Sequence, residues 1–349
     1  MGFTEKQIKE IREYLEQSHN PLFFFDNDAD GLCSFLLLRR AFGKGKGVPI
    51  RSFPELNASY FRKVQELKAD YIFILDKPLV ADEFLKEAEK YNIPIVWIDH
   101  HEIQNANRFS ELVKYYNPTL NEQKSTEPTT FLCYQVANKK EDILFAVVGC
   151  ISDRHLPDFY EDFTKKYADL SIESKNAFDV YYTSQIGKIA RIFSFALKDS
   201  ITNVVNMLKF LVQVKMPYEI LEEDKRNYTM HKRFRQIHGR YMKLLIKAED
   251  HYKKGGKLLF FQYGGDLSIS SDLSNELSYR FPKKIIVVVY VTGIKANISV
   301  RGEKIREAVL KSIEDIDGAT GGGHENAVGV QMRIENLGKF RKSLKELAK

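Results

Sequence analysis

Cysteine is scarce in this chain of 349 residues, which holds only Cys33, Cys133 and Cys150. All three lie in apolar surroundings, and none has C-x-x-C spacing. Small secreted domains that depend on disulfides carry many more cysteines, so that class is excluded and a cysteine-ligated zinc site is disfavoured. We therefore expect three buried, reduced thiols and an intracellular, cytoplasmic location.

Long apolar stretches are also missing, and no run approaches the length needed to span a membrane. The first twenty residues place charged side chains around Ile8, Ile11 and Leu15, which predicts an amphipathic helix rather than the apolar core of a signal peptide. Neither sign of charge dominates, because 53 basic residues face 47 acidic ones. With 44% hydrophobic residues, the chain has the composition and length of two domains and a connector.

The apolar run at residues 93–98 ends abruptly in Asp99, His100 and His101. An uninterrupted run rich in β-branched residues is typical of a parallel strand that is covered on both faces. Ligands bind at the carboxyl ends of such strands, so three strong donor groups there indicate a site. Taken alone, the same residues fit an ordinary junction between a strand and a solvated loop equally well.

Three further apolar runs end in aspartates, and we interpret all of them as strands. Residues 22–25 lead into Asp26-Asn27-Asp28-Ala29-Asp30-Gly31, residues 71–75 into Asp76, and residues 143–151 into Asp153. Four aspartates at one sheet edge would repel one another, and divalent cations would relieve that repulsion. A donor set rich in oxygen, with some imidazole and no thiolate, favours Mn or Mg over structural Zn and suggests two metal ions.

These motifs, together with Gly321-Gly322-Gly323-His324 near the end of the chain, resemble the DHH phosphoesterases that carry a DHHA1 domain. The pattern looks most like the archaeal RecJ-like nucleases. The resemblance implies two bound ions, Mn with Mg as the alternative, and catalytic roles for Asp99, His100 and His101. The metal contacts it implies are Asp26, Asp28, Asp76, Asp99, His100 and Asp153.

The resemblance also implies an α/β fold in three parts, with the active site in the cleft between the first and the last. These parts are a parallel-sheet DHH domain (1–157), a helical connector (158–253) and a smaller α/β DHHA1 domain (254–349). The substrate contacts implied in the last part are Ser299, Arg301, Gly322, Gly323 and His324. The glycine run itself predicts a loop whose amides point into one concavity and bind an oxyanion; a plain glycine turn is the alternative.

Local patterns predict the elements between these motifs. The sequence Gly43-Lys44-Gly45-Lys46-Gly47 is typical of a helix end, and less so of a phosphate loop. Thr129 and Thr130 open a helix, either as caps or as phosphate contacts. The predicted helices are 32–42, 81–91, 126–137 and 273–279, and the predicted strands are 48–53, 112–116, 258–263, 285–292 and 295–300.

From Asp224 to Lys257 the chain carries eleven basic residues and three acidic ones, within a stretch of helical spacing. Tyr228, Phe234 and Tyr241 are interleaved with them. Basic and aromatic residues together suit a nucleic acid strand. The alternatives are a solvated helix face for the charges and core packing for the aromatic rings.

The favoured function is a Mn-dependent, single-strand-specific exonuclease that acts on DNA or RNA in repair or replication. The resemblance to the short archaeal forms of the Hef-associated type favours 3′ to 5′ cleavage and a partner such as the Hef helicase/nuclease. One alternative is a phosphodiesterase or phosphatase for oligoribonucleotides, cyclic dinucleotides or adenosine bisphosphate. Another is an inactive RecJ-like replisome scaffold, against which the complete ligand set argues. Assembly of the chain into a homo-oligomer is a further alternative that the sequence does not decide.

Overall fold

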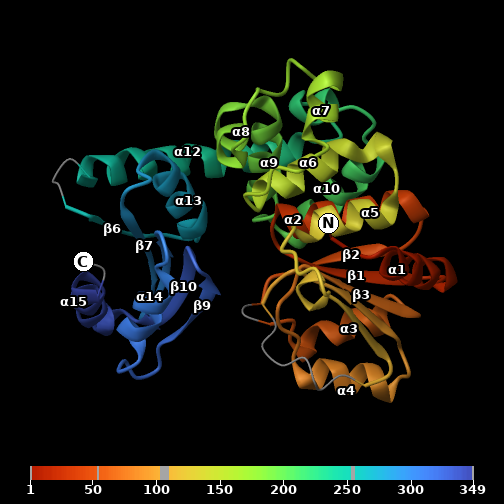
Figure 1. Ribbon diagram of the computed structural model, residues 1–349, viewed down its shortest axis with the longest axis horizontal. Coiled ribbons are helices and arrows are strands. Elements are labelled where there is room, and N and C mark those ends of the chain that lie inside the picture. Colours follow the sequence, from red (N-terminus) through yellow and green to blue (C-terminus); the bar gives the residue numbers. More distant parts are fainter. Residues whose placement is uncertain (1, 53–54, 103–109, 253–255, 348–349) are drawn as a thin grey trace. The chain divides into compact units, whose positions relative to one another are not determined.

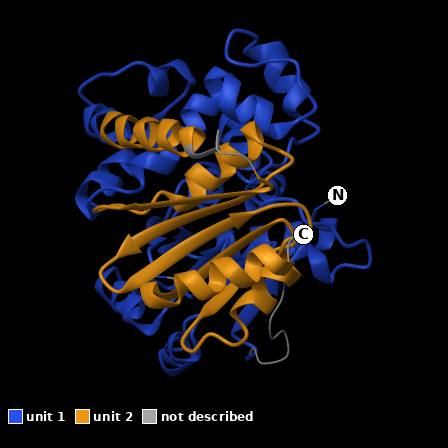
Figure 2. Cartoon of the chain, turned by 90° about the vertical axis from the view of Figure 1, so that its left-hand side faces the viewer, with its two compact units in different colours: residues 1–234 blue, residues 235–349 orange. Residues whose placement is uncertain are grey.

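The computed structural model describes residues 2–52, 55–102, 110–252 and 256–347. Phe53, Lys253 and Lys254, which fall in segments considered above, lie outside the described residues. The chain forms two compact units, Met1–Phe234 and Arg235–Lys349, coloured separately in Figure 2. Within the described ranges no helix is long and apolar enough to cross a membrane.

The first unit is built on a five-stranded parallel sheet, as the sequence predicts. The strand order is β2-β1-β3-β4-β5. All four parallel pairings are in register, so the carboxyl ends of β1, β3 and β4 meet at one edge. The strands are β1 (Pro21–Asp26), β2 (Lys46–Ile50), β3 (Tyr71–Leu75), β4 (Ile95–Ile98) and β5 (Val113–Tyr116).

Helices cover both faces of this sheet (Figure 1), which is why its strands are apolar on both sides. On one face the ring of Phe35 in α2 packs 5.5 Å from that of Phe23 and 5.3 Å from that of Phe25. On the other, Phe24 contacts Phe84. The helices of the first face include α1 (Glu5–Gln17), α2 (Ala29–Phe42) and α5 (Thr129–Ala137); those of the second are α3 (Phe61–Glu66) and α4 (Asp82–Lys90).

The apolar run that ends before Asp153 is a helix, α6 (Ile143–Ser152), and its prediction as a strand was wrong. Residues 143–151 are all buried, because α6 packs among α2, α5 and α9 (Gln185–Ala196). A helix that is apolar on every side has no periodicity, so its sequence looks like that of a buried strand. Asp153 therefore follows a helix, whose last residue is Ser152.

The stretch after Asp153 is helical through Tyr252, as predicted. It comprises α7 (Tyr160–Lys166), α8 (Ala177–Thr183), α9, α10 (Ile201–Gln213), α11 (Tyr218–Leu221) and α12 (Tyr228–Tyr252). The division between the two compact units falls within α12. Phe234 and Tyr241 are buried side chains of α12, so their helical spacing reflects core packing rather than a surface for bases.

The second unit contains a mixed five-stranded sheet in the order β6-β7-β8-β10-β9. Only the pair β6 and β7 is parallel. Its strands are β6 (Leu258–Gly264), β7 (Ile285–Thr292), β8 (Lys295–Arg301), β9 (Thr320–His324) and β10 (Ala327–Arg333). Helix α13 (Ser270–Arg280) packs on β7 and β8, while α14 (Arg306–Ile313) and α15 (Leu337–Leu347) enclose the apolar core of the opposite face.

The glycine run predicted to be an anion-binding loop is the edge strand β9, which corrects that prediction. It pairs antiparallel with β10, with Gly322 opposite Gly329. Gly323 has φ +141°, and a Cβ there would meet the carbonyl oxygen of Ala327 at 2.3 Å. The glycine at this position is therefore required by close backbone approach rather than by a nest of amides.

Candidate metal centre

His100 is the centre of a cluster of carboxylates in the first unit. Its Nε2 lies 3.4 Å from Asp76 Oδ1, 3.7 Å from Asp153 Oδ2 and 3.9 Å from Asp30 Oδ2. His100, Asp76 and Asp30 are buried, whereas the side chain of Asp153 is 42% exposed. His100, in the motif after β4, is thus approached by carboxylates from three places in the fold. These are the residue after β3, the first turn of α2 and the residue after α6.

Two groups of donor atoms in this cluster are close enough to hold a cation. Asp76, His100 and His101 form one, and Asp30, His100 and Asp153 form the other. His101 donates from Nδ1 to Asp99 Oδ1 at 2.7 Å, and the hydroxyl of Tyr115 lies 3.3 Å from Asp99 Oδ2. Asp99 is therefore engaged with His101, although it was predicted as a metal contact.

Asp30 was left out of the predicted ligand set, yet the structure places it at His100. The backbone N–H groups of Thr129 and Thr130 donate to its two carboxylate oxygens at 3.0 and 2.7 Å. The Thr129 hydroxyl donates to Asp76 at 3.1 Å. The amides at the start of α5 thus hold a carboxylate, and they are not available for a phosphate. The signal in the sequence was the third aspartate of the Asp-x-Asp-x-Asp pattern.

The other two aspartates of that pattern make different contacts. Asp26 Oδ1 accepts from the ammonium of Lys77 at 2.9 Å. Asp28 begins α2 as its N-cap and accepts from the N–H of Gly31 at 2.9 Å. Neither belongs to the two groups above, and the metal contacts predicted for Asp26 and Asp28 stay predictions. Lys77, whose importance sequence reasoning missed, directly follows Asp76 in the chain.

Asp76 itself adopts φ +59°, a left-handed conformation that non-glycine residues rarely accept. It is the residue that follows β3, so the turn aims its carboxylate at His100 instead of continuing along the strand. Strain of about 1–3 kcal/mol at such a residue persists only where the surroundings hold it. Here the surroundings are His100 and Thr129.

The charges in the cluster are not balanced. Burial, followed by the neighbouring Asp76 carboxylate, raises the pKa of Asp30 well above the usual range. Burial also opposes ionisation of Asp76, but the hydrogen bond and charge of His100 prevail and lower its pKa to about 2. An excess of buried carboxylates with shared imidazole ligands fits hard divalent cations such as Mn²⁺ or Mg²⁺, which would supply the missing positive charge.

The five residues predicted to contact substrate lie in the second unit, on two strands of its sheet. Ser299 and Arg301 are buried on β8, and Gly322, Gly323 and His324 are on β9. Arg301 and His324 both pair with Ala327 of β10, which lies between them. Directly opposite residues share a face of an antiparallel pair, so the two side chains stand on the same face, two strands apart.

That face is polar around β8. Arg301 donates from Nε to the Asn275 side chain at 2.7 Å and from Nη1 to the Val300 carbonyl at 2.8 Å. The hydroxyl of Ser299 donates to that of Ser270 at 3.1 Å and lies 3.3 Å from that of Ser271. A set of hydroxyl and guanidinium donors at the start of α13 is suited to binding phosphate oxygens.

Comparison with known proteins agrees with this description. Residues 22–170 match the DHH family N-terminal domain, and residues 255–349 match the DHHA1 domain. No curated protein matches the chain. The fold is similar to that of RecJ from Thermus thermophilus in complex with Mn²⁺, with a TM-score of 0.72 and 17% identity over 100% of this chain and 55% of that one. This chain therefore spans about half the length of that RecJ.

Two other solved structures have the same fold. An exonuclease RecJ bound to manganese matches with a TM-score of 0.65 and 14% identity, over 99% of this chain and 96% of that one. An exopolyphosphatase-related protein from Bacteroides fragilis matches with a TM-score of 0.50 and 13% identity, over 99% and 98%. The two domains and the carboxylate cluster define a metal-dependent phosphoesterase, a hydrolase. The chain belongs to the DHH/DHHA1 family.

Proposed function

We propose that this protein is a Mn-dependent exonuclease that removes nucleotides from single-stranded DNA or RNA, with 3′ to 5′ polarity, in repair or replication. The observation that carries the proposal is the convergence of Asp30, Asp76 and Asp153 on His100. These four residues would hold the cations. Bound divalent ions at such a site polarise a phosphodiester and lower the pKa of water.

His101 is suited to hold a proton at the reacting phosphate. Burial lowers its pKa, but the charge and hydrogen bond of Asp99 outweigh burial and raise it above the usual value. The bond from Nδ1 to Asp99 also fixes the ring, so Nε2 is directed away from that carboxylate. In this proposal, Nε2–H donates to a phosphate oxygen or to the departing oxygen.

The DHHA1 unit would bind the end of the strand. Ser299, Arg301 and His324 share one face of the second sheet, and phosphate is the group that their donors fit. A strand held by its terminal nucleotide there, and cleaved next to it, would be degraded from the end.

Helix α12 offers a route for the rest of the strand. Lys232, Arg235, Arg240 and Lys243 are solvent-accessible, and their spacing places them on one side of the helix. Arg233 differs, because its guanidinium donates to the carbonyl of Lys198, just beyond the end of α9. With Phe234 and Tyr241 buried, α12 would attract phosphates mainly by charge; of the three interleaved aromatic residues, Tyr228 alone is exposed, at 49%, and could stack on a base.

A length series of single strands tests the proposal. Strands of two to forty nucleotides, labelled at either end, are incubated with Mn²⁺, and the products are separated by size. We expect mononucleotides released from the 3′ end and faster turnover on longer strands. Hydrolysis confined to dinucleotides would support the small-substrate alternative, which the shared fold of the exopolyphosphatase-related protein keeps relevant. Absence of any hydrolysis would favour the inactive scaffold.

A further inference from the structure

A hollow of about 1000 Å³ lies in the first unit, beside the edge strand β2. Its walls are β2, the segment that leads into α3, and α10. None of the residues that line it belongs to the carboxylate cluster around His100. We propose that this groove, called here the β2–α10 groove, binds an amphipathic helical segment of a partner protein that carries acidic side chains beside its apolar face.

The charge of the groove is of one sign. Among its 21 lining residues, all of them described, six are basic and none is acidic. The whole chain has 53 basic and 47 acidic residues, so the groove alone holds as many cations as the net excess of six. The basic residues are Arg39, Lys46, Arg51, Arg62, Lys63 and Lys209.

These cations are not all available to a partner. Arg62 and Lys63 both pair with Glu66, at 3.0 and 2.6 Å. Arg51 donates to the carbonyls of residues 197 and 199. Arg39, Lys46 and Lys209, in contrast, form no ion pair with a carboxylate of the described chain. Three uncompensated cations around one hollow favour an acidic occupant.

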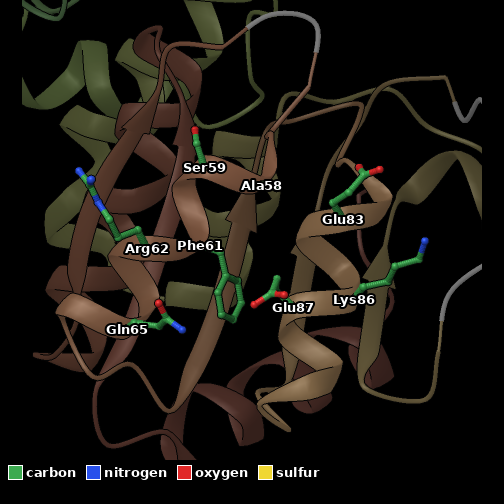
Figure 3. A pocket seen from close by; sticks show the side chains of 8 residues that line it. All are labelled: Ala58, Ser59, Phe61, Arg62, Gln65, Glu83, Lys86 and Glu87. Carbon is green, nitrogen blue, oxygen red and sulfur yellow. The ribbon is translucent and has the colours of Figure 1, made fainter.

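A second hollow in the first unit does not share this bias. It measures about 800 Å³ and lies between α3 and α4. Figure 3 shows Phe61 on α3 beside Glu87 on α4 within it. Its charged residues are balanced, because Arg62 and Lys86 are accompanied by Glu83 and Glu87. That hollow gives no reason to expect a ligand of either sign.

Apolar side chains line the α10 wall of the β2–α10 groove. Ile201, Val205, Leu208 and Val212 follow one another at helical spacing, with Ile201 67% exposed and Val205 37% exposed. Over these residues α10 rises about 16 Å, or three turns, at about 1.5 Å per residue. An amphipathic helix of similar length laid along this wall would cover exposed apolar surface, which is favourable by about 25 cal/mol per Å².

The β2 wall of the groove favours a helix over an added strand as the occupant. β2 is an edge strand and would be open to a further strand, but Pro49 in it has no N–H to donate, which favours a helix as the occupant.

A single-stranded nucleic acid is disfavoured as the occupant of the β2–α10 groove for a different reason. Of the two aromatic residues in the groove, Phe35 is buried, and the Tyr60 hydroxyl accepts from the N–H of Arg51 while its ring packs edge-on against Phe24. Tyr60 is only half-buried, but its ring is already packed, so bases find little ring surface on which to stack.

The test begins with selection of peptides from a random library of 16 residues on the full-length chain. The dominant peptide is then labelled and titrated against three proteins by fluorescence anisotropy. These are the wild type, the groove variant Lys46→Glu/Lys209→Glu and the control variant Lys124→Glu/Lys175→Glu, which makes the same change of charge at exposed lysines outside the groove. Val205→Asp tests the apolar wall separately.

We expect selected peptides with net negative charge and apolar residues at helical spacing. Their affinity should fall at least tenfold in the groove variant and in Val205→Asp, and stay unchanged in the control. Hydrogen exchange of β2 and α10 should slow when peptide is bound. The groove variant should still hydrolyse nucleic acid, if the wild type does, since none of these residues is in the metal centre.

Other outcomes overturn the proposal. Selection of no peptide, of peptides without negative charge, or of peptides that bind the groove variant equally would each do so. Loss of binding to a twenty-residue oligothymidylate in the groove variant, without an effect on peptides, would assign the groove to nucleic acid. A smaller mass of the groove variant than of the wild type in light scattering would assign it to a second copy of this chain.

Discussion

The ammonium of Lys77 lies 2.9 Å from Oδ1 of Asp26, at the edge of the carboxylate cluster, and its side chain is only 3% exposed. It also lies 3.3 Å from the carbonyl of Ser52. Lys77 is thus a fixed cation that belongs to the fold, and it neutralises one of the clustered aspartates.

Lys77→Met should therefore destabilise the protein. Removing one partner of a buried pair costs about 3–5 kcal/mol, but Asp26 is about one-third exposed, so we expect about 1–3 kcal/mol in urea unfolding. Lys63→Met removes the ion pair of a solvent-accessible lysine with the exposed Glu66 and should change the stability much less than Lys77→Met. Addition of Asp26→Asn to Lys77→Met should recover part of the loss. Equal stability of both single variants would mean that the buried Lys77 pair contributes no more than the exposed Lys63–Glu66 pair.

Asp30→Asn should weaken Mn²⁺ binding more than tenfold, because the carboxylate that faces His100 loses its charge. The single amide oxygen of asparagine can accept from only one of the two α5 amides that Asp30 binds, so the variant should lose some stability, and retained folding is checked by circular dichroism. Calorimetric titration with Mn²⁺ measures the effect, and the exposed Asp158→Asn serves as the control. Unchanged Mn²⁺ affinity in Asp30→Asn would show that this carboxylate holds only the amides of α5.

The next prediction concerns Arg301 and His324, which are proposed to bind the phosphate at the strand end in the DHHA1 unit. His324→Ala should lower kcat/KM by about ten- to a hundredfold, corresponding to about 1.5–3 kcal/mol for a lost charge-assisted contact. Arg301→Lys should have a similar effect, because lysine keeps the charge but not the bond pattern to Asn275. Mn²⁺ titration should be unchanged in both variants. Wild-type kinetics on strands and dinucleotides alike would remove this face from the substrate site.

The basic side of α12 is tested by salt dependence. Arg235→Glu/Arg240→Glu/Lys243→Glu should weaken binding of long single strands and reduce the log–log salt slope by about 0.7 for each lost phosphate contact. Dinucleotide hydrolysis should hardly change. Arg233→Glu is the contrasting variant, since Arg233 holds the carbonyl of Lys198 and its loss should lower stability first. An unaltered slope in the triple variant would identify α12 as an ordinary solvated helix.

The parallel sheet could be predicted because its strands follow the physical rule for two-sided burial, and the aspartates that end β1 and β3 and the Asp-His-His motif after β4 were located correctly. The same rule failed at residues 143–152, where a helix enclosed by other helices is equally apolar. Which of Asp26, Asp28 and Asp30 lies beside His100 could not be predicted, because it depends on Lys77 and on the start of α5, which are distant in sequence. The glycines of β9 were likewise indistinguishable from a loop until β10 was paired with them.

The central claim is that the side chains around His100 hold divalent cations that hydrolysis requires. Its most direct test is Mn²⁺ binding followed by electron paramagnetic resonance, in the wild type and in His100→Ala, with retained folding checked by circular dichroism. We predict saturable Mn²⁺ binding in the wild type, strong loss of it in His100→Ala, and loss of hydrolysis in that variant and in excess chelator. Full Mn²⁺ binding by His100→Ala, or full hydrolysis in excess chelator, would contradict the account.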